Sequence, residues 1–204
     1  MRLLFWLLLF LLLPYVASAQ ISLYGGATAS TVHSQYLVGD TQPHLGYQLG
    51  ATYCGSAFQA TSFRPGFSLE LSQRGYTQEI DDIRHAYRLT YLIAYPHLSY
   101  FVRERWSVTT GIELNALIRA RYRQGSERIG VIENYRGSDI GLRAELRWQC
   151  STTFGIYAGY THGLRNLVKY PNISDTGDFV GTIRDVNFRT AQIGFLITMF
   201  DYEK

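Results

Sequence analysis

The most regular feature of the sequence is an alternation of apolar and polar residues, clearest from Trp106 to Arg121 (WSVTTGIELNALIRAR). The apolar set is Trp106, Val108, Thr110, Ile112, Leu114, Ala116 and Ile118, and the polar set is Ser107, Thr109, Gly111, Glu113, Asn115, Arg119 and Arg121. A period of two is that of a strand with a different environment on each face. The stretch is long for a soluble sheet but suits a strand that crosses a bilayer at a tilt, which needs about 9–11 residues. It therefore predicts a transmembrane β-strand.

Eight stretches of this kind follow one another, and the gaps between them are mostly long and short in turn. They cover residues 20–31, 44–53, 63–76, 88–101, 106–121, 138–148, 154–163 and 186–200. This layout predicts an all-β fold, an eight-stranded antiparallel up-and-down transmembrane β-barrel with long loops outside and short turns in the periplasm. Both termini are then periplasmic. The fourth stretch is apolar on both faces and contains Pro96, so its register stays open.

The N-terminus has the pattern of a secretory signal peptide. Arg2 precedes an apolar run, Leu3 to Leu13, and the small residues Ala17-Ser18-Ala19 follow. The run is too short for a membrane helix, which needs about 20 residues. We therefore expect a cleaved signal peptide at residues 1–19, a single barrel domain at residues 20–204, and residence in the bacterial outer membrane.

Composition agrees with a barrel and argues against some partners. The chain holds 16 Tyr and 19 Gly but 5 Pro and 2 Met, a balance typical of membrane barrels, in which half of each strand is polar. The net charge of +3 is close to zero and gives no reason to expect a nucleic-acid partner.

Aromatic residues gather at the predicted strand ends, which favours a membrane barrel over a soluble barrel of the lipocalin type. The short-turn ends carry Tyr53, Phe63, Phe101, Trp106, Trp148, Phe154 and Phe200, and the long-loop ends carry Tyr76, Tyr87, Tyr91, Tyr122 and Tyr160. Two aromatic rings are the girdles of a membrane barrel. Tyr53, Trp106, Trp148, Phe154 and Phe200 are the predicted periplasmic girdle.

If the apolar face meets lipid, charged residues must fill the lumen. The inward charges are then Glu70, Glu113, Arg143, Glu145 and Arg147. Buried charges need partners, and an eight-stranded lumen is just wide enough for side chains. Pairing Trp106 with Trp148 brings Glu113 close to Arg143, which predicts a structural ion-pair plug instead of a conducting pore.

The chain resembles the PorT-like outer-membrane β-barrel proteins of Bacteroidetes-type bacteria. The similar stretches are Leu69 to Gln78 (LELSQRGYTQ), Tyr91 to Phe101 (YLIAYPHLSYF), Gly159 to Leu167 (GYTHGLRNL) and Phe188 to Phe200 (FRTAQIGFLITMF). The resemblance implies an eight-stranded barrel of the OmpA/OmpX-like kind over the mature chain. Since some relatives are linked to type IX secretion, it also implies an accessory role there as one alternative.

The chemical motifs are sparse. His97 and Ser99 have the H-x-S spacing of lipid A deacylases, which leaves a lipid-modifying hydrolase as a second alternative. However, they fall near the periplasmic end, so we expect no enzyme and no catalytic residues. The remaining histidines have no metal-ligand spacing, and we expect no metal and no cofactor.

Arginines and cysteines supply two further hypotheses. Arginines at the loop ends are suited to lipopolysaccharide phosphates, the other reading being a solvated surface: Arg84, Arg88, Arg119, Arg121, Arg123, Arg128 and Arg136. Cys54 and Cys150 lie on opposite sides of the periplasmic rim, so a disulfide and two separate thiols both stay open. The leading function is that of a non-enzymatic structural or accessory barrel that contacts outer-membrane lipid and binds a protein or lipopolysaccharide through its loops.

Overall fold

The computed structural model describes residues 20–33, 41–55, 62–80, 83–124, 127–130, 135–165, 167, 171–173, 179–182 and 186–201. The predicted signal peptide lies outside these ranges. Eight long strands form the fold: β1 Gln20–His33, β2 Thr41–Cys54, β3 Phe63–Ile80, β4 Ile83–Arg103, β5 Trp106–Gln124, β7 Ser138–Gln149, β8 Phe154–Gly163 and β11 Asn187–Asp201. Three short strands accompany them: β6 Glu127–Gly130, β9 Pro171–Ile173 and β10 Phe179–Thr182. Within the described ranges, no helix is long and apolar enough to span a membrane.

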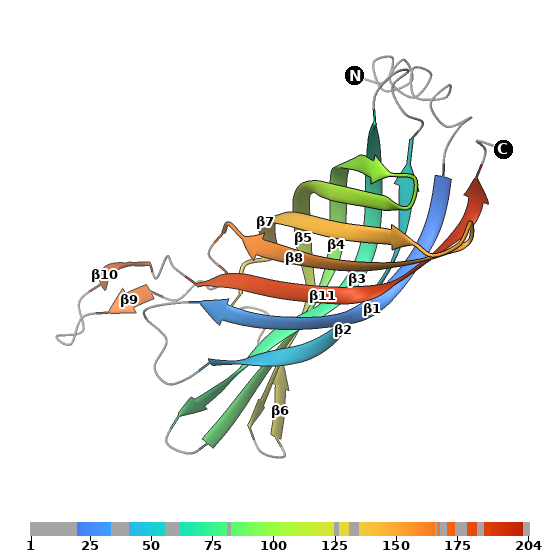
Figure 1. Ribbon diagram of the computed structural model, residues 1–204. Coiled ribbons are helices and arrows are strands. Elements are labelled where there is room, and N and C mark those ends of the chain that lie inside the picture. Colours follow the sequence, from blue (N-terminus) through green and yellow to red (C-terminus); the bar gives the residue numbers. More distant parts are fainter. Residues whose placement is uncertain are drawn as a thin grey trace, which may run out of the picture.

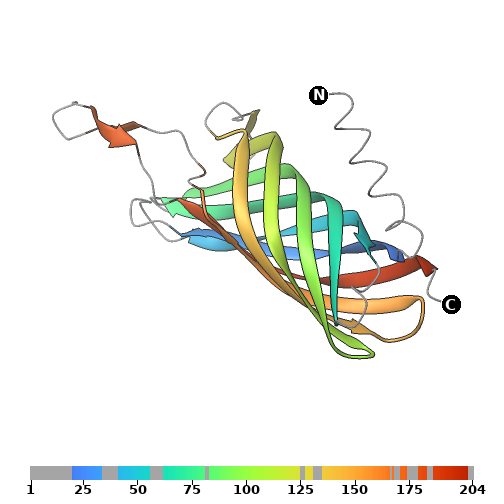
Figure 2. The ribbon, with the colours of Figure 1, turned by 90° about the horizontal axis from the view of Figure 1, so that it is seen from above.

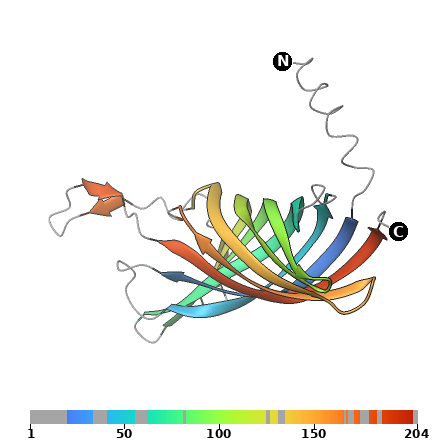
Figure 3. The same cartoon turned by 45° about the horizontal axis from the view of Figure 1, so that its top comes forward.

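The eight long strands close into an antiparallel up-and-down barrel, as the sequence predicts. Sequential neighbours pair from β1 to β5, β5 pairs with β7, β7 with β8, β8 with β11, and β11 returns to β1. Figures 2 and 3 show these strands wrapping around one axis with a strong tilt. Each of the eight long strands therefore has a partner on both sides in the barrel, and closure removes the exposed edges of an open sheet there.

The two ends of the barrel differ. The start of β1, the end of β11 and the turns that follow β4 and β7 share one end, called here the turn end (Figure 1). The opposite end, the loop end, carries β6 and the separate β9–β10 hairpin (Figure 1).

The strand faces are apolar outside and polar inside. Outward side chains remain about half exposed around the whole wall, among them Leu23, Leu49, Leu69, Leu92, Ile112, Leu142, Ile156 and Phe195. In contrast, Glu70, Glu113 and Arg143 are at most 2% exposed in the lumen. A soluble barrel has the opposite arrangement, since large exposed apolar belts are rare in water. The wall is therefore built to meet lipid.

The predicted register between the central strands is present. Trp106 pairs with Trp148 and Glu113 with Gly141. The two indole rings stack with centroids 5.7 Å apart, and both are more than a third exposed at the turn end. Phe154 is likewise exposed and Tyr53 is half-buried on the outer face. The side chain of Phe200 lies outside the described ones.

Pro96 does not disturb the register of β4. Phe67 of β3 pairs with Pro96 in an unbroken ladder, and β4 keeps one register with β5 on both sides of the proline. The apolar inner face of β4 has a different cause. Its residues Leu89, Tyr91, Ile93 and Tyr95 are buried in the lumen.

The outer aromatic girdle predicted from the sequence is wrong for four of its five tyrosines. Tyr76 and Tyr91 are buried in the lumen, where Tyr76 stacks on Tyr87 and Tyr87 contacts Tyr122. Tyr76 has the same parity along β3 as the inward Glu70, so position near a strand end does not decide the face. Only Tyr160 of this set is exposed on the outer wall.

A β-bulge changes the phase of β5 near its loop end. Thr90 pairs with Arg119 but Tyr91 pairs with Leu117, so Ile118 is the extra residue. Beyond it Ala120 is buried while Arg119 and Arg121 are exposed. The sequence pattern assigns these arginines to the inward polar set, and the bulge reverses that assignment.

The charged gap between the third and fourth predicted strands, residues 77–87, was expected to be a loop, but its described residues 77–80 and 83–87 are strand. Strands β3 and β4 stay paired as far as Ile80 and Ile83. Strand β5 runs on to Gln124 and pairs there with β6. Charged side chains do not prevent a hairpin ladder when they stay exposed, as Glu79 and Arg84 do. Thus β3 to β6 extend the wall beyond the barrel at the loop end.

Candidate functional site

A buried ion-pair network crosses the lumen. Arg143 of β7 is its hub, because its guanidinium lies 2.7 Å from Glu70 of β3, 3.2 Å from Glu113 of β5, and also contacts Glu145. Arg147 donates to Glu145 Oε2 at 2.6 Å. All five residues of the predicted lumen set therefore meet in one cluster, and the expected Glu113–Arg143 contact is among its bonds.

The sequence prediction missed several members of this network. Arg74 of β3 donates to Glu113 at 2.8 Å and is fully buried. Tyr24 donates to Glu70 at 2.9 Å, and Thr161 donates to Glu113 at 2.9 Å. Parity alone indicates Arg74, which is four residues from Glu70 on the same strand face. With Arg74 included, three arginines balance three glutamates.

An apolar and aromatic layer fills the lumen on the loop side of the network. Its buried members are Val32, Tyr76, Leu89, Tyr91, Ile93, Tyr95, Ala120, Tyr135, Leu167, Val186 and Phe188. Tyr95 joins the two layers, since the Arg143 guanidinium lies 4.8 Å from its ring centre. The described lumen thus combines a charged layer with an apolar one, as expected of an eight-stranded barrel whose interior is just wide enough for side chains.

Outward-facing arginines gather on the extension of the wall at the loop end. Arg88 of β4 pairs directly with Arg121 of β5, and Arg123 pairs with Ala86 one step farther out. A cavity of about 330 Å³ on this surface is lined by His44, Thr77, Arg84, Ala86, Arg88 and Arg123. We call Arg84, Arg88, Arg121 and Arg123 the arginine patch. Like charges placed opposite each other on neighbouring strands repel, so this surface favours an anion.

The remaining loop-end arginines are distributed differently. Arg119 is exposed on β5 at the bulge, and Arg136 precedes β7, where its backbone N–H donates to Leu167. The side chain of Arg128 lies outside the described ones, although its backbone pairs with Arg123. The cluster is therefore narrower than the rim predicted from the sequence. The bulge at Ile118 is what places Arg121 and Arg123 on the same surface as Arg88.

His97 and Ser99, the candidate residues for a hydrolase site, make their side-chain contacts with other residues of the lumen. His97 and Ser99 are buried in the lumen, in the half nearer the turn end. His97 Nε2 lies 3.2 Å from Thr52 Oγ1, and Ser99 Oγ lies 2.8 Å from Thr109 Oγ1. Both side chains therefore take part in the hydroxyl contacts of the lumen wall.

The two cysteines are not joined by a disulfide. Cys54 ends β2 and Cys150 follows β7, and β1, β11 and β8 lie between those two strands in the barrel wall. A bridge requires Cα atoms within about 7 Å, so the turns would have to fold across the opening. Among the described residues, no three His, Cys, Asp or Glu side chains form a group that could hold a metal ion.

These features define a class: an eight-stranded up-and-down β-barrel of the outer-membrane type, with an apolar outer wall and a filled lumen. Comparison with solved structures finds the same fold in known outer-membrane proteins. Neisserial surface protein A superposes with a TM-score of 0.56 at 12% identity, over 89% of this chain and 99% of that one. Ail of Yersinia pestis, solved in complex with the heparin analogue sucrose octasulfate, gives 0.50 at 16% identity with the same coverage.

At such low identity the likeness concerns the fold alone. No protein-family model matches the chain, and neither does any curated protein sequence.

Proposed function

We propose that this protein is a non-enzymatic barrel of the bacterial outer membrane, held in the outer leaflet by lipopolysaccharide phosphates on its arginine patch. In this proposal residues 1–19 are removed as a signal peptide, the turn end and both termini face the periplasm, and the loop end faces outward. Short turns at the end that holds both termini are typical of that orientation.

The observation that carries the proposal is the position of the arginine patch above the apolar wall. Leu92 of β4 and Ile118 of β5 are about half exposed, and Arg88 and Arg121 follow them toward the loop end on the same outer surface. In a bilayer, a change from apolar to charged side chains along the outer surface marks the boundary between the acyl chains and the headgroups. Guanidinium groups bind phosphate oxygens by paired hydrogen bonds, which suits the phosphates of lipid A.

One acidic side chain lies beside the arginine patch among the side chains that the structure describes. Glu79 pairs across the strands with Arg84, and it is the acidic neighbour within the described part of this surface. Arg88 and Arg121 lie directly opposite each other, so positive charge is concentrated at this pair. Phosphate groups would relieve the repulsion between Arg88 and Arg121.

The test is binding of purified lipopolysaccharide to the folded protein in detergent. We expect Arg88→Gln/Arg121→Gln to weaken binding on the order of tenfold or more, because each arginine contributes charged hydrogen bonds. Arg189→Gln is the matched control, since Arg189 is exposed on β11 at the loop end and outside the arginine patch. Sucrose octasulfate serves as a polyanionic competitor.

Equal binding by the parent and the double variant would contradict the proposal, and so would an equal loss in the Arg189→Gln control. Binding of dephosphorylated lipid A as tightly as the intact form would also contradict it, since the phosphates are the proposed ligands.

Membership of the PorT-like family, and with it an accessory role in type IX secretion, stays a prediction from the sequence resemblance. Loss of secreted proteins on deletion of the gene would support it. The hydrolase alternative predicts a changed acyl pattern of lipid A in the same strain.

A further inference from the structure

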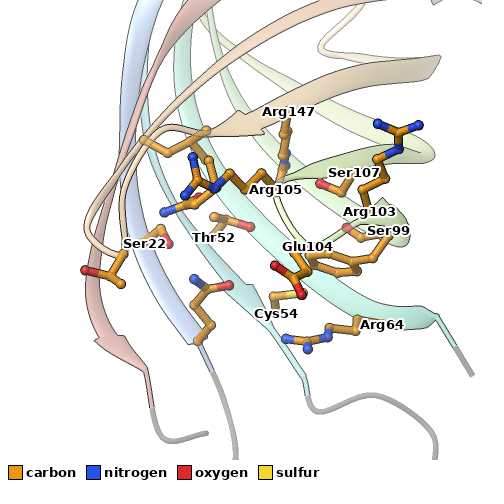
Figure 4. A pocket seen from close by; sticks show the side chains of 15 residues that line it. Ser22, Thr52, Cys54, Arg64, Ser99, Arg103, Glu104, Arg105, Ser107 and Arg147 are labelled. Atoms are coloured by element: carbon orange, nitrogen blue, oxygen red, sulfur yellow. The ribbon is translucent and has the colours of Figure 1, made fainter. Parts of the chain in front are cut away.

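The turn end of the barrel contains a cavity that has no role in the proposed function. A cavity of about 550 Å³ opens there between the strand ends (Figure 4). This volume is within the range of about 300–1,000 Å³ typical of small-molecule sites. Its lining comes from strands all around the barrel, from Gln20 of β1 to Leu196 of β11. We call this cavity the vestibule.

Positive charge dominates the lining of the vestibule. It contains four arginines and one acidic residue: Arg64, Arg103, Arg105, Arg147 and Glu104. Arg147 is bound by the buried Glu145, so its charge is compensated. Arg103 ends β4 and Arg105 lies in the turn before β5, and both side chains are exposed on either side of Glu104. The rim therefore keeps a net positive charge toward solvent.

Arg64 is held in place by an aromatic ring. Its guanidinium carbon lies 4.6 Å from the ring centre of Phe101, which also lines the vestibule. Stacking of this kind fixes the plane of a guanidinium group, so Arg64 is a fixed part of the vestibule wall. Figure 4 shows Arg64, Cys54 and Glu104 on the same side of the vestibule.

The floor of the vestibule is lined by hydroxyl groups. Ser22, Thr52, Ser99 and Ser107 point into it from four different strands and are each less than a tenth exposed. Ser68 donates to Thr52 at 2.9 Å, and Ser99 lies 2.8 Å from Thr109. These contacts fix the hydroxyl oxygens in position. An arginine rim above a floor of fixed hydroxyls presents donors to anionic oxygen atoms from both sides.

We propose that the vestibule is a binding site for a small anion that carries several carboxylate or phosphate oxygens. Arg103 and Arg105 bind the charged groups, and Ser22, Thr52 and Ser99 bind oxygen atoms deeper in the cavity. Glu104 limits the affinity by like-charge repulsion. The site lies at the opposite end of the barrel from the arginine patch, so each proposal fails or stands by its own experiment.

The test is titration of the folded, full-length protein with citrate and, separately, with inorganic phosphate at low ionic strength. We expect saturable binding of one anion per protein by at least one probe. The preferred probe identifies the ligand as a carboxylate or a phosphate. Arg103→Gln/Arg105→Gln should weaken binding about tenfold or more, since charged hydrogen bonds are lost. Glu104→Gln should strengthen it, and added salt should weaken it.

Arg119→Gln is the control, because Arg119 is an exposed arginine of β5 near the other end of the barrel. Three results would each overturn the proposal: no saturable binding of either anion, the same affinity in the parent and the double arginine variant, or an equal loss in the control. A weaker affinity in Glu104→Gln would do so as well. Exposed turn residues leave the barrel wall intact, so loss of folding does not obscure the outcome.

A second measurement uses the thiol that lines the vestibule. In a Cys150→Ser background, Cys54 should react faster with an anionic methanethiosulfonate reagent than with a cationic one, and Arg103→Gln/Arg105→Gln should reduce that ratio. A cationic preference in the parent would contradict a positive vestibule.

Discussion

Arg143→Ala is expected to destabilise the barrel by about 3–5 kcal/mol, the cost of breaking a buried ion pair from one side. Arg143 contacts Glu70, Glu113 and Glu145, and its side chain is 1% exposed. Its loss leaves three buried carboxylates to two arginines, Arg74 and Arg147. The midpoint of urea unfolding in lipid or detergent measures the effect.

Two further variants make this result specific. Arg189→Ala removes an exposed arginine and should change stability by less than about 0.5 kcal/mol. Arg143→Met/Glu70→Gln removes one buried positive and one buried negative charge from the network. The remaining two glutamates, Glu113 and Glu145, are then balanced by Arg74 and Arg147. We expect the double variant to recover much of the lost stability. If Arg143→Ala is as stable as Arg189→Ala, the network does not support the barrel.

Ile112→Arg is expected to cost about 2–4 kcal/mol, because an arginine on the lipid face is most costly near the bilayer midplane. Ile112 is 47% exposed and lies midway along the apolar wall, paired with Leu142. Equilibrium unfolding in phospholipid vesicles measures this cost.

The matched control is Ile83→Arg. Ile83 is 45% exposed, almost the same as Ile112, but it lies at the tip of the β3–β4 hairpin beyond the wall. There the cost should be about 0–1 kcal/mol, as found near or outside the interfaces. Equal tolerance of arginine at both positions would mean that water, not lipid, covers Ile112.

Periodicity was enough to predict the barrel itself and the contents of its lumen. The pairing of Trp106 with Trp148 follows from the alternation and from the short turns that both residues border at the same end, and it brings Glu113 to Arg143 without further information. Charged residues on the inner face of strands have few alternatives to pairing with each other. The fold and the centre of the network therefore follow from the alternation along each strand and the antiparallel order of the strands.

The features that the sequence did not predict arise where the inward–outward alternation is interrupted, where a residue type suits both faces, or where strand ends far apart in the chain meet. The bulge at Ile118 moves Arg121 to the outer wall, and nothing in the local pattern marks the extra residue. The inward tyrosines were misassigned because aromatic residues suit both a membrane interface and a filled lumen. The vestibule is assembled from strand ends far apart in the chain, so no single stretch indicates it.

The most direct test of a lipid-facing wall with arginines at headgroup level is depth measurement by spin labels in phospholipid bilayers. Single labels replace Ile112 and Arg121 in a cysteine-free chain, and collisions with oxygen and with a water-soluble nickel chelate are compared. We predict that the label at 112 is reached by oxygen and protected from nickel, and that the label at 121 is reached by nickel at the headgroup level. Equal access of nickel to both labels would contradict it.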